Sequence, residues 1–359
     1  MRSSTGVHYL ALDHLRALAA FMVFTWHFLH AGHGYPIPFD GAPRVFPLAL
    51  LDEGHTGVAL FMTLSGYLFA KLLDGASVRY GWFIYNRLLR LLPILIVTML
   101  LYVVMIYGQG GDLKAVWRDI RRGWLYPTLP NGGWSITVEF HFYLVLPFLL
   151  LVDRFRPALL FALIALFIAI RLYLYTRYGE IQTLAYWTII GRIDQFTLGI
   201  LAYRYRALFS RGAVMLIAGL MFCAFYWWFD WRGGFYNLPS YPSPSRLWVV
   251  LPMIEGLAYG ILIAWYDARL IDGRSVVSRF FGQLGAYSYS IYLLHFFVVF
   301  HAAQFIDQSV MRLSNFYVAC AWSLIVFCLM IVPGYLSFRF IESPFLKLRK
   351  RYIARPDPA

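Results

Sequence analysis

Apolar runs recur along the whole chain and alternate with short polar connections. Each run is about 20 residues long, which is the length that an α-helix needs to cross the hydrocarbon core of a bilayer. The approximate limits of the runs are 9–30, 56–73, 88–107, 134–152, 157–175, 183–203, 213–231, 247–266, 284–305 and 316–338. The pattern predicts an all-α polytopic membrane protein with about ten transmembrane helices, organised as one membrane domain over residues 1–359.

Composition agrees with this class. Of the 359 residues, 60% are hydrophobic and 14% are charged, and the mean hydropathy is +0.62. A soluble protein of this length could not bury so much apolar surface. No long polar block interrupts the runs, so we expect no appended soluble domain. The residues before the first run are too few for a cleaved signal peptide, and we expect that run to remain as an anchor.

The distribution of Lys and Arg residues among the loops predicts the orientation of the chain in the membrane. The formal charge of +13 would suggest nucleic-acid binding in a soluble protein, but basic residues of membrane proteins collect in cytoplasmic loops. With an even number of spans, loops on the side of the termini hold 19 of the 31 Lys and Arg residues, against 10 on the other side. We therefore expect no nucleic-acid partner and place both termini, with a basic tail at 346–359, in the cytoplasm.

One basic stretch, LKAVWRDIRRGW at 113–124, fits poorly in an outside loop. An amphipathic helix lying in the membrane interface would explain it, as would misplaced span limits there. The three cysteines lie in apolar runs, where we expect them to serve packing. The nine histidines form no cluster with ligand spacing, so we expect no metal.

The first run carries unusual charges for a membrane span. In LDHLRALAAFMVFTWH, Arg16 and His27 are eleven residues apart. About three helical turns separate them, so they share one face at ~16 Å along the axis. Charged groups inside a span are costly and usually line a cavity or pair with something. The alternative is that Arg16 extends to the interface and His27 is a structural interfacial histidine.

The fourth run carries a carboxylate, Glu139, whose neighbours one helical turn away are Ser135 and Tyr143. Because this run enters from outside, we expect Glu139 at roughly the depth of His27, where the two could form a base and its orienting partner. A structural ion pair is the alternative. His141 points to another face of the helix, and we expect it to be structural.

Two further pairs of charges stand out. Arg87 and Arg90, in NRLLRLLP, lie at the cytoplasmic start of the third run. They either anchor the span or clamp an anion such as a phosphate-bearing cofactor. Arg192 and Asp194 lie two residues apart in the sixth run, so we expect each to have a different partner.

Other polar and aromatic side chains in the runs are candidates for lining a path through the bundle. Ser288, Tyr292 and His295 are spaced by four and three residues and share one helical stripe, although a structural role for His295 is the simpler interpretation. The full set of candidates comprises His55, Ser65, Trp134, Ser135, Tyr143, Ser288, Tyr292 and His295.

Taken in this order, these segments resemble acyltransferase family 3, the integral-membrane O-acyltransferases that modify bacterial surface and exported polysaccharides and some small molecules. The resemblance covers about residues 9–345. It is carried by LDHLRALAAFMVFTWH, GVALFMTLSGYL, NRLLRLLP, WSITVEFHFYLVLP, SYSIYLLH and IESP before a basic tail. Each block is weakly specific alone, and their order makes the combination specific.

The resemblance implies transfer of an acyl group, usually acetyl, from cytoplasmic acyl-coenzyme A to a sugar hydroxyl at or beyond a bacterial inner membrane. Arg16 and His27 correspond to the key pair of the family, Glu139 to its glutamate, and Arg87 and Arg90 to its basic stretch. We expect the arginines, Arg16 with Arg87 or Arg90, to hold the cofactor. We expect His27 to act as general base or transient acyl carrier, with Glu139 orienting it or taking up its charge.

Two positions depart from the family. An acidic residue often follows GV in the second block, where this chain has Ala59, and a polar pair often follows the glutamate, where this chain has Phe140 and His141. Any role of that acid is absent here or filled elsewhere, and the second departure could change the choice of acceptor.

Two rival functions are compatible with polar residues on several spans. The first is an exporter or flippase of a glycan or lipid-linked sugar, although we find no internal repeat typical of many transporters. The second is a structural subunit of an envelope complex, for which Arg16, His27 and Glu139 would be dispensable. The expected partners are membrane lipid, a carbohydrate acceptor and the machinery that makes or exports polysaccharide.

Overall fold

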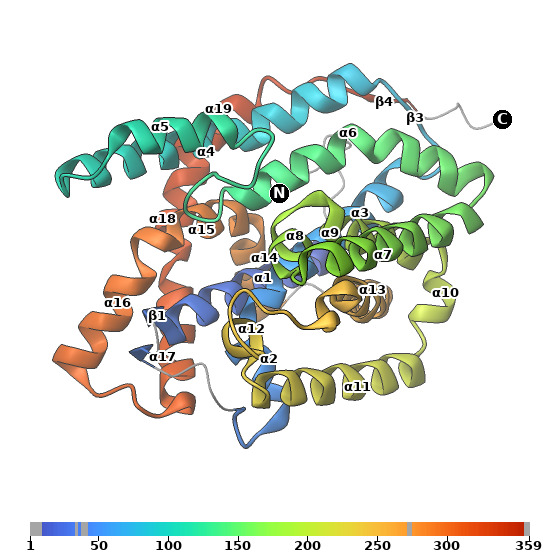
Figure 1. Cartoon of the computed structure of the whole chain (residues 1–359). Coiled ribbons are helices and arrows are strands. Elements are labelled where there is room, and N and C mark those ends of the chain that lie inside the picture. Colours follow the sequence, from blue (N-terminus) through green and yellow to red (C-terminus); the bar gives the residue numbers. More distant parts are fainter. Residues whose placement is uncertain (1–8, 33–34, 37–41, 271–274, 355–359) are drawn as a thin grey trace.

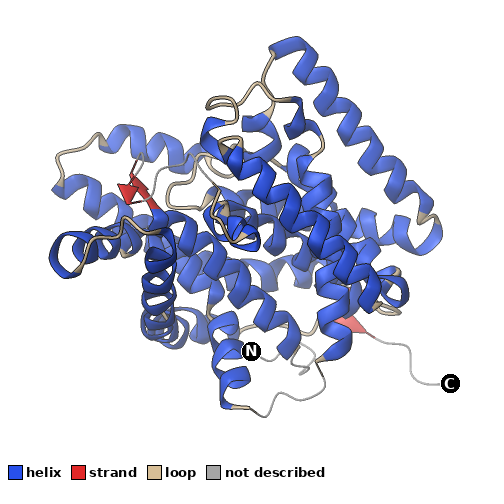
Figure 2. Cartoon of the chain, turned by 90° about the horizontal axis from the view of Figure 1, so that it is seen from below, coloured by secondary structure: helices blue, strands red, loops and turns tan. Residues whose placement is uncertain are grey.

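The computed structural model describes residues 9–32, 35–36, 42–270 and 275–354, and its regular structure is almost entirely helical (Figures 1 and 2). The long helices are α1 (Leu10–Leu29), α3 (Gly57–Leu73), α4 (Tyr80–Gly108), α6 (Trp134–Phe155), α7 (Ala158–Tyr178), α9 (Ile189–Arg204), α11 (Gly212–Trp231), α13 (Leu251–Arg269) and α17 (Phe316–Leu329).

Shorter elements connect or extend the long helices. The short α-helices are α2 (Ala49–Asp52), α5 (Leu113–Arg122), α8 (Gln182–Trp187), α10 (Arg206–Phe209), α12 (Gly234–Asn237), α14 (Val276–Ala286), α15 (Ser288–Leu294), α16 (Val299–Phe305), α18 (Ile331–Ser337) and α19 (Ser343–Leu346). The 3₁₀ and π segments are η1 (Phe46–Leu48), η2 (Gly54–Thr56), η3 (Arg246–Val249), η4 (His295–Phe297), η5 (Ile306–Val310) and η6 (Phe338–Glu342). Two antiparallel strand pairs join β1 (His30–Gly32) to β2 (Tyr35–Pro36), and β3 (Ser77–Val78) to β4 (Ile353–Ala354).

Six helices within the described residues are long and apolar enough to cross a membrane. They are Gly54–Leu73, Tyr80–Gly108, Trp134–Phe155, Ala158–Tyr178, Gly212–Trp231 and Phe316–Leu346. A bent pair, Ser288–Phe297 and Val299–Val310, would be a seventh. These helices support an all-α, multi-pass membrane protein. The total of about ten spans and the cytoplasmic termini stay predictions.

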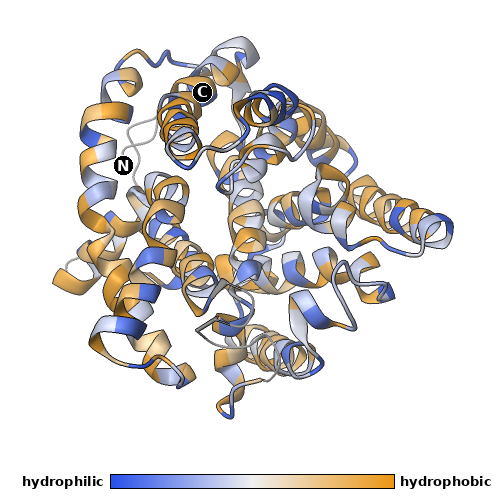
Figure 3. Cartoon of the chain, turned by 60° about the vertical axis from the view of Figure 1, so that its left-hand side comes forward, coloured by the Kyte–Doolittle hydropathy of each residue, from blue (hydrophilic) through white to orange (hydrophobic). Residues whose placement is uncertain are grey.

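The outward faces of the peripheral helices are apolar, as expected of surfaces that meet lipid. Hydrophobic residues run along these helices in Figure 3. On α4 they include Ile96, Leu100 and Val104, and on α11 they include Leu216 and Leu220, all more than half exposed. In water such a surface would be costly, so the exposed side chains and the long helices point to the same environment.

Helix α1 lies at the centre of the molecule (Figure 1). It packs against α3, α13, α14, α15, α16 and α17, and Leu18 is its one exposed residue. Because protein surrounds it, α1 can carry Asp13, Arg16 and His27 without presenting them to lipid. Helices α9 and α13 are interior as well. The helices of the first, sixth and eighth runs are therefore covered by protein and need not be strongly apolar.

Glycines let the interior helices approach closely. A Cβ atom on Gly66 of α3 would lie 2.0 Å from the carbonyl oxygen of Phe196 in α9, and one on Gly199 of α9 would lie 2.0 Å from the carbonyl oxygen of Thr63. Two backbones are therefore in direct contact at this crossing, which fits the small residues seen in GVALFMTLSGYL.

Several predicted span limits are wrong. The helix that contains the third run, α4, begins at Tyr80, eight residues before the predicted limit. Arg87 and Arg90 therefore lie inside α4 and not at its start. The sixth run is broken between α8 and α9 at Thr188. The ninth run is divided among α14, α15 and α16, with a bend of 56° beside Val298. Hydrophobicity alone carries no information about these breaks, because helical and broken segments are equally apolar.

The basic stretch at 113–124 does form a short helix, α5. Asp112 caps it by accepting hydrogen bonds from the N–H groups of Lys114 at 2.8 Å and Ala115 at 3.3 Å. Val116 is its one buried residue, and the arginines are exposed or partly exposed. The expected amphipathic helix is present, and its position in a membrane interface stays a prediction.

Candidate functional site

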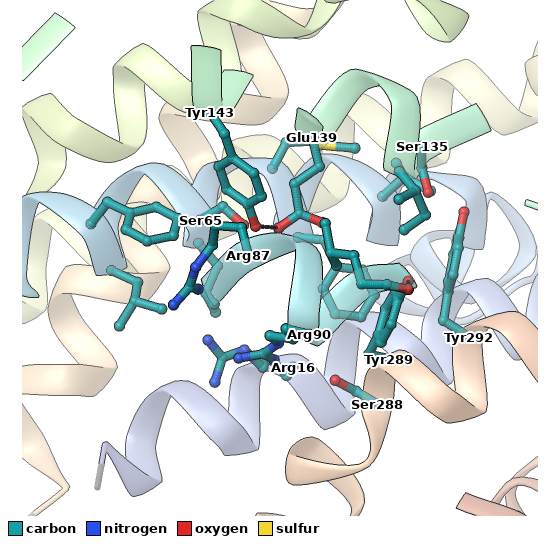
Figure 4. A pocket seen from close by; sticks show the side chains of 18 residues that line it. Arg16, Ser65, Arg87, Arg90, Ser135, Glu139, Tyr143, Ser288, Tyr289 and Tyr292 are labelled. Carbon is teal, nitrogen blue, oxygen red and sulfur yellow. Dashed lines mark hydrogen bonds between the residues drawn. The ribbon is translucent and has the colours of Figure 1, made fainter. Parts of the chain in front are cut away.

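A pocket opens between α1, α3, α4, α6 and α15 (Figure 4). It contains about 740 Å³ of space that no atom fills, including its open mouth. The lining residues are Arg16, Val58, Phe61, Met62, Leu64, Ser65, Leu68, Phe69, Arg87, Arg90, Leu91, Ser135, Ile136, Glu139, Tyr143, Ser288, Tyr289 and Tyr292. The wall is apolar with a few convergent polar groups, which is the usual character of a small-molecule site.

The pocket gathers most of the residues proposed from the sequence. Those that line it are Arg16, Ser65, Arg87, Arg90, Ser135, Glu139, Tyr143, Ser288 and Tyr292. Those that do not are His27, His55, Trp134 and His295. In Figure 4 the guanidinium groups gather at one end of the pocket, and the hydroxyls of Ser135 and Tyr292 lie at the other.

Three arginines give the pocket a strongly cationic end. Arg16 donates a hydrogen bond to Asp13 at 2.5 Å across one turn of α1. Arg87 is 7% exposed, and its Nε has no hydrogen-bond partner. Neither Arg87 nor Arg90 forms an ion pair with any residue that the structure describes. A buried, unpaired guanidinium is costly, so this end of the pocket is built to receive an anion.

Glu139 lies among these cations and not beside His27. It accepts a hydrogen bond from the hydroxyl of Tyr143 one turn further along α6, as its spacing predicted. It also interacts electrostatically with Arg16. No contact joins Glu139 to His27 among the described residues, so the expected base–carboxylate pair is not formed. The depth argument failed because Glu139 lies at the same pocket as Arg16, near the other end of α1, and one sequence cannot reveal how two helices are placed along each other.

His27 instead pairs with a second histidine. Its ring lies 5.2 Å from that of His295 between centroids, and the rings of Phe296 and Phe300 lie 4.6 Å and 5.8 Å away. His295 is 1% exposed. The rings of His295, Phe296 and Phe300 therefore form an aromatic enclosure around His27.

The tautomer of His295 follows from its contacts. Its Nδ1 lies 2.5 Å from the carbonyl oxygen of Tyr292. A carbonyl only accepts, so Nδ1 carries the proton, and the Nε2 of the neutral ring is an acceptor. That Nε2 is buried without a hydrogen-bond partner. His295 therefore presents an unused basic nitrogen in the enclosure that contains His27.

Tyr292 connects the cationic pocket with the two histidines. It lines the pocket, and its ring lies 5.8 Å from that of His295. Its hydroxyl donates to the carbonyl oxygen of Gly132 at 3.2 Å. Gly132 has φ +75°, and a Cβ atom there would lie about 3 Å from the Tyr292 ring. The loop before α6 thus packs tightly against this tyrosine and fixes its position.

His55 and Trp134 lie in a separate aromatic region. His55 is fully buried, and its Nε2 lies 2.9 Å from the carboxylate of Glu53. Trp134 packs against Trp187, with ring centroids 4.6 Å apart. The ring of Tyr186 contacts both His55 and Trp134. Their contacts in this structure are those of packed core residues.

The charges of the sixth run have different partners, as predicted. Arg192 interacts with Gln195 at 3.1 Å and lies 3.7 Å from Glu255. Asp194 pairs at 2.5 Å with Arg171, and both are fully buried. Arg171 lies within α7, which extends to Tyr178, and its side chain points into the protein interior.

Sequence analysis missed Tyr289, which lines the pocket and donates a hydrogen bond to the carbonyl oxygen of Leu91 at 2.8 Å. Tyr289 directly follows Ser288, a candidate residue, and this adjacency could have indicated that Tyr289 also lines the pocket. Sequence analysis also missed Glu342, which is buried in the π-helical segment η6 and accepts a hydrogen bond from Ser290. The tail motif IESP contains this glutamate, and π-helical turns often mark functional positions.

The fold and the pocket define a multi-pass helical membrane protein with an internal pocket lined by three arginines, joined through Tyr292 to a pair of histidines. The chain belongs to acyltransferase family 3, since the family's model, described as an acyltransferase domain, matches residues 9–332. This confirms the family resemblance of the motifs.

Curated relatives come from Staphylococcus aureus. Proteins of strains COL, MSSA476 and MRSA252 carry the name "Putative O-acetyltransferase" and are each 24% identical over 351 residues. The alignment covers 83% of this chain and 53% of each relative, so the chain spans about half the length of these proteins. No solved structure matches the chain.

Proposed function

We propose that this protein is a membrane-bound O-acyltransferase that moves an acyl group, in the first place acetyl, from acyl-coenzyme A to a hydroxyl of a sugar in a surface or exported polysaccharide. The observation that carries this proposal is the pocket end formed by Arg16, Arg87 and Arg90, where Arg87 and Arg90 form no ion pair with a residue in the described part of the chain. The names of the Staphylococcus aureus relatives support acetyl transfer to oxygen.

The residues present fit an anionic donor. Coenzyme A carries a diphosphate and a 3′-phosphate, and guanidinium groups bind phosphate through charge-assisted, bidentate hydrogen bonds. Arg87 and Arg90 are one turn apart on α4 and face Arg16 across the pocket. A neutral sugar alone would leave these charges uncompensated.

We assign the chemistry to His27, which lies at the opposite end of α1 from Arg16, and to His295 beside it. His27 takes the proton of the acceptor hydroxyl, whose oxygen forms a bond to the acyl carbon while the bond from that carbon to sulfur breaks. The proton then passes to the leaving thiolate. We assign to His295, whose ring packs beside that of His27 and whose Nε2 is unused, the exchange of a proton with His27.

Distance along α1 relates the two ends of the site. Arg16 and His27 are about 16 Å apart on one face of the helix. A donor held by its phosphates near Arg16 can present its thioester near His27 because the pantetheine arm is long. We propose the bacterial inner membrane as the location, with the donor entering from the cytoplasmic side and a carbohydrate acceptor as partner.

The experiment is acyl transfer from radiolabelled acetyl-coenzyme A in inside-out and right-side-out membrane vesicles, comparing wild type with His27→Ala. We expect labelled polysaccharide in wild-type vesicles only, and only when the donor reaches the cytoplasmic face. A positioned base supplies about 10²–10⁴ in rate, so the variant should be nearly inactive. Full activity of a folded His27→Ala protein would remove His27 from the mechanism.

The same vesicles test the rival function. An exporter or flippase would move a glycan across the membrane without incorporating label in either preparation. That result would replace the transferase proposal.

A further inference from the structure

The C-terminal segment after α19 folds back along the first turns of α4. Its strand β4 pairs with β3 in the connection between α3 and α4, with Ile353 opposite Val78. The N–H of Arg79 donates to the carbonyl oxygen of Tyr352 at 2.8 Å, and Tyr352 is 1% exposed. The segment is therefore docked through backbone bonds and a buried aromatic ring.

Asn86 fixes this segment next to the pocket arginines. Its side-chain amide donates to the carbonyl oxygen of Lys350 at 2.7 Å and accepts from the N–H of Lys350 at 2.9 Å. Asn86 is fully buried and directly precedes Arg87 on α4. The two hydrogen bonds hold Lys350, and with it the neighbouring Arg349, beside the turn that carries Arg87 and Arg90.

Arg349 adds a further cation to the arginine cluster. Its Nε donates to the carbonyl oxygen of Leu346 at 2.9 Å, and it forms no ion pair with a described residue. Burial, followed by repulsion from Arg90 and Arg87, lowers the pKa of Arg349. Cations brought close together repel one another, and an anion bound between them would offset that cost.

The order of groups along the site indicates which phosphate group of the donor would lie beside Arg349. The docked segment contacts α4 at residues 79–86, Arg87 and Arg90 follow, and Tyr289 contacts Leu91 beyond them. The thioester must lie toward His27, so the nucleotide end of the donor lies toward the docked segment. In coenzyme A that end carries the 3′-phosphate.

We propose that Arg349 binds the 3′-phosphate of the acyl-coenzyme A donor, so that the C-terminal segment selects the complete cofactor over a donor without this phosphate. The proposal rests on the transferase function proposed above. Arg349 is a substrate-binding residue in this scheme and takes no part in the chemistry at His27.

The test compares acetyl-coenzyme A with acetyl-dephospho-coenzyme A, which lacks only the 3′-phosphate. We expect wild type to have a KM about tenfold higher for the dephospho donor, with a similar kcat, because one charge-assisted contact is lost. Arg349→Ala should raise the KM for acetyl-coenzyme A about tenfold above the wild-type value. It should leave the KM for the dephospho donor within about twofold of the wild-type value for that donor. Arg349→Lys should fall between Arg349→Ala and wild type.

Arg351→Ala is the matched control. Arg351 is exposed in the same segment, and its removal changes the net charge equally. Its kinetics should match wild type with both donors. An equal rise in KM for both donors in Arg349→Ala, or no rise, would overturn the proposal.

The wild-type comparison alone is decisive if a variant fails to fold. Equal use of the two donors by wild type would overturn the role of the 3′-phosphate while the transferase function stands. Transfer from neither donor would overturn the transferase function itself, and the proposal for Arg349 with it.

Discussion

Among single residues, His295 is the clearest test of how the site works. Asparagine can donate to the carbonyl oxygen of Tyr292 as Nδ1 of the histidine does, but it has no group at the position of Nε2. His295→Asn should therefore keep the local structure and lose the unused basic nitrogen. We expect kcat to fall about 10²-fold and the KM for acetyl-coenzyme A to stay within twofold.

His141→Asn provides the comparison for this variant. His141 lies outside the pocket, with its Nε2 3.1 Å from the carbonyl oxygen of Trp124, and its replacement should leave turnover unchanged. Wild-type kcat in a folded His295→Asn protein would show that His27 works without this neighbour.

From the sequence, the residues that line the pocket could be predicted, but the contacts between them could not. Charged groups within apolar runs are rare enough to be noticed, and Arg16, Arg87, Arg90 and Glu139 indeed line one pocket. The partner of His27 was missed because contacts between helices depend on crossing points. A periodic pattern places residues on a face of one helix and says nothing about the residues opposite.

At the scale of helices, the crossing of α3 and α9 leaves no room for an added methyl group. A methyl group on Gly66 would overlap the carbonyl oxygen of Phe196, so Gly66→Ala must push the two helices apart. Overpacking of this kind costs about 1–3 kcal/mol. We expect a lower thermal midpoint of unfolding for the detergent-solubilised variant and reduced activity, because α3 also carries the pocket residue Ser65.

Gly219→Ala in α11 makes the same chemical change without the overlap. The nearest atom to a Cβ atom there is Cε of Met215 at 3.4 Å, and the midpoint should equal that of wild type or exceed it slightly. If both alanine variants behaved alike, the close crossing would not limit stability.

Helix positions were predictable because the signal is local. Every predicted run contains a helix, and the basic stretch at 113–124 contains α5. The bend beside Val298 and the break at Thr188 were not predictable, since they arise where a helix meets its neighbours. Gly285 illustrates how closely such neighbours meet: a Cβ atom there would lie 1.7 Å from the carbonyl oxygen of Asp13, so the end of α14 lies directly against α1.

For the molecule as a whole, the distribution of basic residues predicts which face meets the cytoplasm. Lys347 lies in the C-terminal segment, and Ser240 lies in the loop after α11, and both are exposed. In a protein whose three native cysteines are replaced by alanine, we expect a membrane-impermeant maleimide to label Ser240→Cys in right-side-out vesicles. Lys347→Cys should react only in inside-out vesicles or after detergent is added.

Labelling of both cysteines from one side would mean that an even number of spans separates the loop from the tail, in place of the three that the sequence predicts. Labelling with the two sides exchanged would invert the molecule and place the arginine cluster outside. Cys223, Cys320 and Cys328 are partly buried, so reactivity of the parent protein without them provides the baseline.

The central position of α1 has a consequence for how the protein is made. Within the described residues α1 precedes every other helix, whereas α14, α15, α16 and α17, which cover much of it, lie beyond residue 275 and are synthesised long after it. Throughout translation α1 must wait in the bilayer with its polar face uncovered, and the bond between Arg16 and Asp13 keeps that charge partly neutralised. The pocket beside α1 is thus complete only after α15 has been synthesised, so a ribosome that stops before that point releases a membrane-inserted chain without the pocket.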